Sequence, residues 1–434
     1  MGPAWLLNPR QIVRSHNERW RRPRSSATVR SVYLAYDLSR ALLRPLNLWA
    51  STVQGAFSSP GVRPLPFVAL VAASGELVER ATRRYPKPPF GLTHTVVAGD
   101  RVAIRETVVL DTPFCRLLRF ERVGVDRADP KLLVVAPLSG HHATLVRETI
   151  QEMLPDHDVY VTDWRDARLV PRAGGSFDLH DYIDLIPRLL AAIGDDVHVL
   201  AVCQPCVPVL AAVAVMENEG TRATPRSMTM ISGPIDARVS PTRVNHFALD
   251  HSLAWLEATL VYRVPPPAPG FGRRVYPGAL QLQAFVSLDV ARHVAAHCKH
   301  FLDVAAFDEK AAEKHRSFYD EYFAVIDLPA ELYLQTVAEV FQEHTLPRGI
   351  MLHRGTRVQP EAITRTALLT IEGAKDDITG LGQTAAAHTL CRSLPASKKQ
   401  HHLQEGVGHY GTFSGRRWRE EVAPVVKAFV RSQS

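Results

Sequence analysis

The chain has 434 residues, with 51 lysines and arginines against 44 aspartates and glutamates, which gives a net charge of +7. Its content of 46% hydrophobic and 22% charged residues is ordinary for a globular protein and excludes a disordered chain, a collagen and a coiled coil. Five cysteines are too few for a dense disulfide framework, and their odd number leaves at least one thiol unpaired. We therefore expect a reducing compartment.

The positive charge is concentrated near the N-terminus. Residues 10–30 contain seven arginines and one acidic residue, a balance of +6, so that residues 31–434 sum to about +1. This basic arm has neither zinc-finger spacing nor an RNP-like motif, and we expect no nucleic-acid partner. Its apolar start is too short for a secretory signal, whereas an Arg-rich, acid-poor start leaves a mitochondrial transit peptide as an alternative.

The first predicted element is a helix over residues 31–54, interrupted at Pro45. It either packs on its own core or lies at an interface beside the basic arm. Residues 55–90 are expected to be a connecting segment with a short helix near Leu77–Ala81. Three stretches of β-type composition follow at Thr95–Val97, Val102–Glu106 and Leu117–Glu121.

An alternation of strands and helices then begins. Buried strands are predicted at Leu132–Ala136, Asp158–Thr162, Val197–Val202 and Met228–Ser232. The helices between them are predicted at Thr144–Met153, Leu179–Ile193 and Pro205–Asn218. Helical patterns fill residues 237–365, after which the alternation resumes. Its last elements are strands at Thr366–Ile371 and Gln400–Leu403 and a helix near Arg416–Val430.

This order predicts an α/β fold with a mostly parallel sheet, helices on both faces and a mainly helical insertion. The expected division is 1–94 for the basic arm and a helical segment, 95–236 and 366–434 for the two parts of the core, and 237–365 for the insertion. Residues 197–216 are apolar enough to suggest a membrane span. A β-branched start and two prolines favour a buried strand followed by a helix, so we expect no transmembrane segment.

Cys203 follows a predicted strand and precedes a predicted helix, which is the position of the nucleophile elbow in α/β-hydrolases. The usual G-x-S-x-G pattern has small residues on both sides of the nucleophile; Ala201 fits it and Pro205 departs from it. A thiol at a helix N-terminus gains thiolate character. Two other interpretations stay open, a buried inert thiol and a redox pair with Cys206.

Two further polar positions follow predicted strands. Asp376 and Asp377 come after the strand that ends at Ile371, where an acid could orient a histidine, although such a pair usually caps a turn. His409 lies in a Gly-flanked loop after the strand that ends at Leu403, and a lone loop histidine is most often structural. Together these positions follow the order nucleophile, acid, histidine, which is that of the α/β-hydrolase triad.

The segment Ser139-Gly140-His141-His142 follows the first buried strand. The loop at this place in α/β-hydrolases supplies one N–H of the oxyanion hole, and Gln204 would supply the other. The two adjacent histidines could suggest a metal pair, but neighbours in sequence do not share a face of a helix or strand. The chain has no H-E-x-x-H and no P-loop motif, so we expect no metal and no bound cofactor.

These residues lie in segments that resemble the bacterial intracellular polyhydroxyalkanoate depolymerases, which degrade granules of poly(3-hydroxybutyrate). The resemblance spans about residues 75 to 430. The matching segments are L-L-V-V-A-P-L-S-G-H-H-A-T-L, L-P-D-H-D-V-Y-V-T-D-W-R-D-A-R, V-H-V-L-A-V-C-Q-P-C-V-P-V-L-A-A-V-A, G-P-I-D, F-Y-D-E-Y, Y-L-Q-T-V, E-G-A-K-D-D-I-T-G and G-V-G-H-Y-G. The resemblance implies an α/β-hydrolase fold with a triad of Cys203, Asp376 and His409, and Asp377 is the second choice for the acid.

The resemblance further implies a carboxylic ester hydrolase that forms a thioester on Cys203 and releases 3-hydroxybutyrate oligomers or monomers. Gln204 and the loop of Ser139, Gly140 and His141 would hold the oxyanion, and either water or coenzyme A would accept the acyl group. Contacts with the substrate are expected from His142, Trp164 and Tyr410. The insertion would form a lid, whose aromatic residues could line a groove although each is more often a core residue: Trp255, Phe271, Tyr276 and Tyr322.

A depolymerase of this kind is expected in the cytoplasm, on the surface of polyhydroxyalkanoate granules and in contact with their coat proteins. Its oligomeric state stays open, with a homodimer among the options. One alternative is a synthase-type acyltransferase, but the related synthases have Gly where this chain has Pro205. The other alternative is a granule-surface binding protein with a degenerate site.

Overall fold

The computed structural model describes residues 42–53, 55, 66–83, 85–288 and 290–434. The basic arm and the first part of the predicted helix over residues 31–54 therefore lie outside the described residues. Residues 42–53 are helical and continuous through Pro45, so the expected interruption is absent from this described part of the helix. The short helix predicted near Leu77–Ala81 is wrong in length, because α3 runs over 17 residues, Pro66–Thr82.

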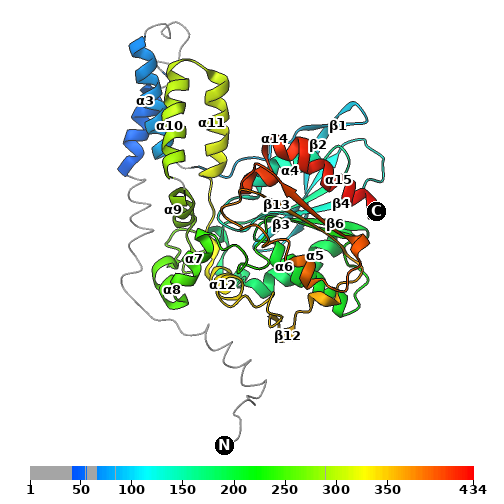
Figure 1. Cartoon of the computed structure of the whole chain (residues 1–434). Coiled ribbons are helices and arrows are strands. Elements are labelled where there is room, and N and C mark those ends of the chain that lie inside the picture. Colours follow the sequence, from blue (N-terminus) through cyan, green and yellow to red (C-terminus); the bar gives the residue numbers. More distant parts are fainter. Residues whose placement is uncertain (1–41, 54, 56–65, 84, 289) are drawn as a thin grey trace, which may run out of the picture.

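A central sheet of nine strands forms the core of the described part of the chain (Figure 1). Its strand order is β1-β2-β3-β5-β4-β6-β7-β13-β14, and the six strands from β5 to β14 in this order are parallel. β1, β2 and β3 extend the sheet in antiparallel pairing. The strands are β1 (His94–Val97), β2 (Asp100–Asp111), β3 (Cys115–Arg122), β4 (Lys131–Val135), β5 (Asp158–Trp164), β6 (Val197–Val202), β7 (Ser227–Ile231), β13 (Ala367–Gly373) and β14 (Lys399–Gln404).

Helices cover both faces of this sheet. α5 (Leu179–Ile193) and α6 (Cys206–Asn218) contact each other below the sheet in Figure 1, and α4 (Arg147–Met153) packs with α15 (Ala423–Ser432) above it. Every residue of β6 is buried, as are ten residues of α6, which explains why residues 197–216 are almost uniformly apolar. Among the described helices, none is long and apolar enough to cross a membrane.

Residues 237–365 connect β7 to β13 and are called the insertion below. They are mainly helical, as predicted, but they also contain a three-stranded sheet and a two-stranded one. The helices are α7 (Arg243–Asp250), α8 (Leu253–Leu260), α9 (Gly278–Leu288), α10 (Val290–Ala305), α11 (Glu309–Tyr322) and α12 (Ala330–Thr336). The strands are β8 (Tyr262–Arg263), β9 (Arg274–Tyr276), β10 (Leu328–Pro329), β11 (Leu352–His353) and β12 (Thr356–Arg357).

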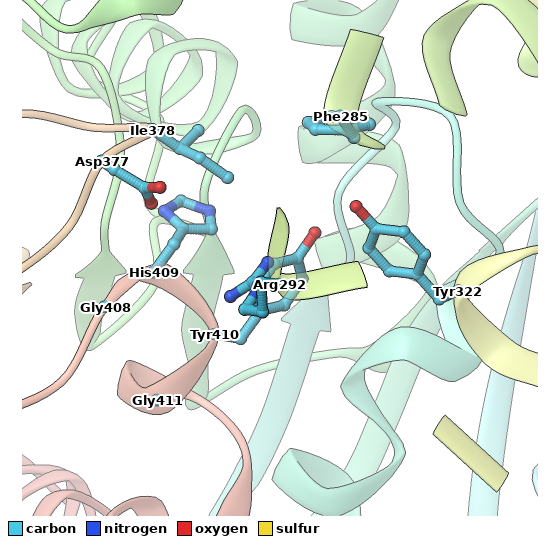
Figure 2. Close-up of a pocket in the computed structure, with 9 residues that line it drawn as sticks. All are labelled: Phe285, Arg292, Tyr322, Asp377, Ile378, Gly408, His409, Tyr410 and Gly411. Carbon is cyan, nitrogen blue, oxygen red and sulfur yellow. The ribbon is translucent and has the colours of Figure 1, made fainter. Parts of the chain in front are cut away.

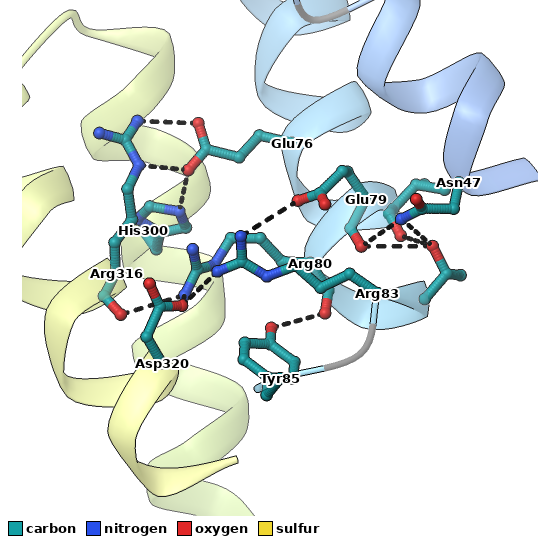
Figure 3. A network of polar contacts seen from close by, with 11 residues as sticks. Asn47, Glu76, Glu79, Arg80, Arg83, Tyr85, His300, Arg316 and Asp320 are labelled. Atoms are coloured by element: carbon teal, nitrogen blue, oxygen red, sulfur yellow. Dashed lines mark hydrogen bonds and ion pairs between the residues drawn. The ribbon is translucent and has the colours of Figure 1, made fainter. Parts of the chain in front are cut away.

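The N-terminal helix α3 packs against α10 of the insertion, away from the central sheet (Figure 1). A carboxylate joins these helices in Figure 3: Glu76 of α3 accepts hydrogen bonds from Arg316 Nε at 2.6 Å and Nη2 at 2.8 Å, and its Oε1 lies 2.9 Å from His300 Nε2. Burial would raise the pKa of Glu76, but the hydrogen bonds and charges of Arg316 and His300 lower it to about 2. Glu76 is therefore an ionised, buried link between three helices.

We predict that Glu76→Gln destabilises the packing of α3 on α10 and α11 by about 3 kcal/mol, because it removes the buried charge to which Arg316 and His300 are hydrogen-bonded. Urea denaturation, with hydrogen exchange of the α3 amides, measures this loss. The pKa of Glu76 is below its ordinary value of 4.5, so its contribution is complete above pH 4.5 and is lost as the pH falls toward 2.

The matched control is Glu309→Gln, because Glu309 accepts a hydrogen bond from the same Arg316 at 2.5 Å but is exposed. This variant should cost less than about 1 kcal/mol. Equal losses in the two variants would contradict a special role for the buried carboxylate.

Candidate active site

Cys203 occupies a tight turn between β6 and α6. Its backbone has a φ of +66°, which a residue with a side chain rarely adopts. The turn is held on both sides, since Cys203 N donates to Ile231 O at 2.7 Å and Cys203 O accepts from Cys206 N at 3.1 Å. This strained strand-to-helix turn is the geometry of a nucleophile elbow, and it presents the side chain at the carboxyl edge of the sheet.

The chain approaches itself closely beneath this turn. A Cβ on Gly233, just after β7, would lie 2.2 Å from Cys206 Cβ and 2.4 Å from its Sγ, so no larger residue fits there. Cys206 is fully buried, and its Sγ lies 3.4 Å from Ala201 O. Burial raises the pKa of Cys206 well above its ordinary value, so this thiol is neutral. Cys206 thus acts as a small core residue at the start of α6.

His409 and Asp376 form a hydrogen-bonded pair. His409 Nδ1 lies 2.8 Å from Asp376 Oδ2 and 3.0 Å from Oδ1, and Asp376 Oδ1 also accepts from the backbone N–H groups of Ile378 and Thr379 at 2.9 and 2.8 Å. The neighbouring Asp377 is exposed and has no hydrogen bond to His409 among the described residues. Of the two candidate acids, the structure pairs Asp376 with the histidine.

The electrostatics of this pair favour a charged histidine. Burial alone would lower the pKa of His409, but the charge of Asp376, the nearby Cys203 and hydrogen bonds to both raise it well above its ordinary value. Burial would raise the pKa of Asp376, and His409 with two backbone N–H groups lowers it. This attraction favours the imidazolium form of His409, and its contribution to stability is lost as the pH rises through the folded-state pKa of His409.

Backbone contacts fix the loops that carry the pair. Lys375 N donates to Val407 O at 2.9 Å, which ties the loop after β13 to the loop before His409. The hydroxyl of Thr412 donates to His409 O at 2.6 Å and lies 3.1 Å from Ser232 Oγ, at the end of β7. Sequence reasoning missed Thr412 and Ser232, because a hydroxyl that positions a loop leaves no motif of its own.

A cavity of about 700 Å³ opens above Cys203. Cys203, Gln204, Ser139, His141, His409 and Tyr410 line it together. The rest of its wall is mostly apolar and comes largely from the insertion, including Phe247 of α7, Leu332 of α12 and Phe341. The structure thus gathers the expected nucleophile, the histidine and most of the expected oxyanion residues at one cavity.

The loop of Ser139, Gly140 and His141 is held by the insertion. Gly140 has a φ of +104° and its O accepts from Ile326 N at 2.8 Å, while His141 Nε2 lies 3.2 Å from Tyr322 O. Burial lowers the pKa of His141 to about 4, so this ring is neutral. Across the cavity, the side-chain Oε1 of Gln204 is buried with no hydrogen-bond partner among the described residues. Polar groups thus remain available there for a ligand.

Several residues expected to contact substrate lie elsewhere. Trp164 is only 2% exposed, and its indole N–H donates to Ala136 O at 2.8 Å, so this side chain lies in the core rather than at the cavity. His142 lines neither of the two cavities described here. Trp255 and Phe271 are 41% and 59% exposed and likewise line neither, whereas Tyr276 lines the large cavity.

A second, smaller cavity of about 190 Å³ adjoins the first (Figure 2). It contains Arg292, Tyr322 and Asp377, and it shares four residues with the large cavity: Phe285, Ile378, His409 and Tyr410. Cys203 lines the large cavity and is absent from the lining of the small one. Within the described part of the chain, no group of three or more His, Cys, Asp or Glu residues is arranged to hold a metal ion.

The parallel sheet with helices on both faces, the elbow turn and the order of the three loops define an α/β-hydrolase fold. Residues 232–434 match the family model described as the C-terminus of PHB de-polymerase. The match agrees with the resemblance found in the sequence and supports ester hydrolysis. No curated protein matches the sequence.

Solved structures similar to this chain include three hydrolytic enzymes. A putative lipase from Acinetobacter baumannii is 13% identical. The alignment covers 76% of this chain and 93% of the lipase, with a TM-score of 0.41. A structure from a study of carboxylesterases of the thaumarchaeon Nitrososphaera gargenis is 13% identical, and the alignment covers 76% of this chain and 100% of that one, with a TM-score of 0.45. A thermophilic esterase from Thermogutta terrifontis is 12% identical. The alignment covers 79% of this chain and 97% of the esterase, with a TM-score of 0.40.

We predict that Asp376→Asn slows alkylation of Cys203 by iodoacetamide at neutral pH at least tenfold, and moves its pH dependence to higher pH. The substitution removes the negative charge that raises the pKa of His409, so fewer molecules hold an imidazolium beside the thiol, and one pKa unit corresponds to a factor of ten. Peptide-resolved mass spectrometry measures the rate, with the exposed Cys298 as an internal reference.

Asp377→Asn is the matched control, since it removes a neighbouring carboxylate that makes no hydrogen bond to His409. Its alkylation rate should stay within twofold of the wild type. A larger effect from Asp377→Asn than from Asp376→Asn would show that Asp377, and not Asp376, is the acid that acts on His409.

Proposed function

We propose that this protein is a polyhydroxyalkanoate depolymerase that cleaves the ester bonds of poly(3-hydroxybutyrate) through a triad of Cys203, His409 and Asp376. The observation that carries the proposal is the elbow turn of Cys203 at the base of a largely apolar cavity that His409 also lines. An uncharged polyester suits such a cavity, because burying its methyl and methylene groups is favourable.

The first half of the reaction forms a thioester. His409, held by Asp376, takes the proton of the Cys203 thiol, and the thiolate attacks the carbonyl carbon of an ester. The negative charge moves to the carbonyl oxygen, where the backbone N–H of Gln204 and the loop of Ser139 to His141 would stabilise it. The carbon–oxygen bond of the ester then breaks, and the imidazolium returns its proton to the leaving 3-alkoxide.

The second half of the reaction frees Cys203. His409 takes a proton from a water molecule, whose oxygen attacks the thioester carbonyl, and the sulfur leaves as a thiolate that regains a proton. The products are a carboxylic acid and the free enzyme. The thiol of coenzyme A could replace water, which would yield a 3-hydroxyacyl thioester instead of an acid.

We expect Cys203→Ala to abolish release of soluble 3-hydroxyacids from amorphous granules, with a loss of at least a thousandfold, because the substitution removes the thiol that forms the acyl intermediate in this mechanism. Enzymatic or chromatographic assay of the released acids measures the rate. The control is Cys298→Ser, which changes an exposed thiol on α10 and should leave the rate unchanged.

Three outcomes would contradict the proposal: continued release by Cys203→Ala, binding of granules by the wild type without turnover, and net polymer formation from a 3-hydroxyacyl coenzyme A. The last would instead indicate a synthase-type acyltransferase.

We further propose that the protein acts in the cytoplasm on granule surfaces, and that the arginines of residues 10–30 bind an anionic granule coat. These residues lie outside the described part of the chain. Deletion of residues 1–30 should weaken co-sedimentation with granules at low salt severalfold while sparing hydrolysis of a soluble oligomer. Unchanged co-sedimentation would show that the arm is not the anchor.

A further inference from the structure

His409 lies where the two cavities meet. It lines both of them, whereas Cys203 lines only the large one. In the proposed reaction the acyl group is attached to Cys203 and the leaving oxygen must reach His409 to receive its proton. The two halves of the substrate are therefore expected on opposite sides of His409, with the acyl half in the large cavity and the leaving half in the small one.

The small cavity has a different chemistry from the large one. Figure 2 shows Arg292 and Tyr322, from α10 and α11, opposite His409 and Asp377. Burial raises the pKa of Tyr322 to about 12, and the positive charge of Arg292 opposes this rise, so the guanidinium lies within electrostatic reach of the phenol. A guanidinium beside phenol hydroxyls is a suitable site for a carboxylate. The negative charge of Asp377 weakens the attraction of this site for a carboxylate ligand, but Asp377 can accept a hydrogen bond from an alcohol.

The two cavities also differ in size. The small cavity, at about 190 Å³, has room for about six water molecules at roughly 30 Å³ each. This volume suits one short hydroxyacid unit. The large cavity, at about 700 Å³, can hold several consecutive units.

We propose that the small cavity is the leaving-group site and binds a single terminal 3-hydroxyacid unit with its carboxylate at Arg292. This inference rests on the proposed depolymerase function. The leaving unit carries a hydroxyl at one end, which receives its proton from His409, and the free carboxylate of the polymer at the other. The remaining chain stays on Cys203 as a thioester until water releases it with a new carboxyl end. The enzyme thus shortens the polymer one unit at a time from its carboxyl end.

The test compares the 3-hydroxybutyrate tetramer bearing a free carboxylate with the methyl ester of the same tetramer. The wild type should release monomer as its first product and should have a kcat/KM at least fivefold higher for the free acid. Arg292→Gln should reduce the ratio of the two kcat/KM values to about one, chiefly through a higher KM for the free acid. Arg292→Lys keeps the charge but loses the bidentate geometry, and it should give an intermediate ratio.

The matched control is Lys299→Gln, on the same helix and absent from the lining of either cavity. It should keep the wild-type ratio. The inference is overturned if the wild type cleaves both tetramers equally, if internal cuts produce dimers first, or if Arg292→Gln retains the preference. Failure of the wild type to cleave either tetramer or granules would instead overturn the proposed function.

Discussion

The left-handed turn at Cys203 is the constraint on which the site depends. A residue with a side chain adopts this backbone only when its surroundings hold it there. Here β7 provides an acceptor at Ile231 O for Cys203 N, and the missing side chain of Gly233 leaves room for Cys206 at the start of α6. The strand, the turn and the helix are thus fixed together, and the thiol is directed into the cavity by the backbone rather than by its own flexibility.

The second requirement is a buried charge pair whose members depend on each other. His409 and Asp376 are both largely buried, and burial disfavours the charged form of each. Their mutual attraction, with backbone N–H groups directed at the carboxylate, opposes that effect and favours the charged form of each. The insertion contributes much of the cavity wall and holds the loop of Ser139 to His141 through Ile326 and Tyr322. The core therefore supplies the charged groups, and the insertion supplies the enclosure around them.

Much of the fold could be predicted because buried parallel strands and their helices have distinctive patterns. The strand at Val197–Val202 and the helix at Leu179–Ile193 match the observed bounds. The predicted helix near Leu77–Ala81 is shorter than α3. The sequence of α3 contains small and polar residues whose burial depends on α10 and α11, far away in the chain. The resemblance led us to expect Trp164 at the substrate, but its side chain is buried in the core, where the indole N–H donates to Ala136 O.

The sequence by itself determined the class of fold, the order of Cys203, Asp376 and His409, and the match of residues 232–434 to the PHB depolymerase family model. These depend on local patterns and on motifs whose residues are close together in the sequence. Only the tertiary structure decided between Asp376 and Asp377 as the partner of His409, and only it revealed two cavities of unequal size that are both lined by His409. The physical reason is that a hydrogen bond and a cavity are made by segments distant in the chain, whose relative positions no local pattern records.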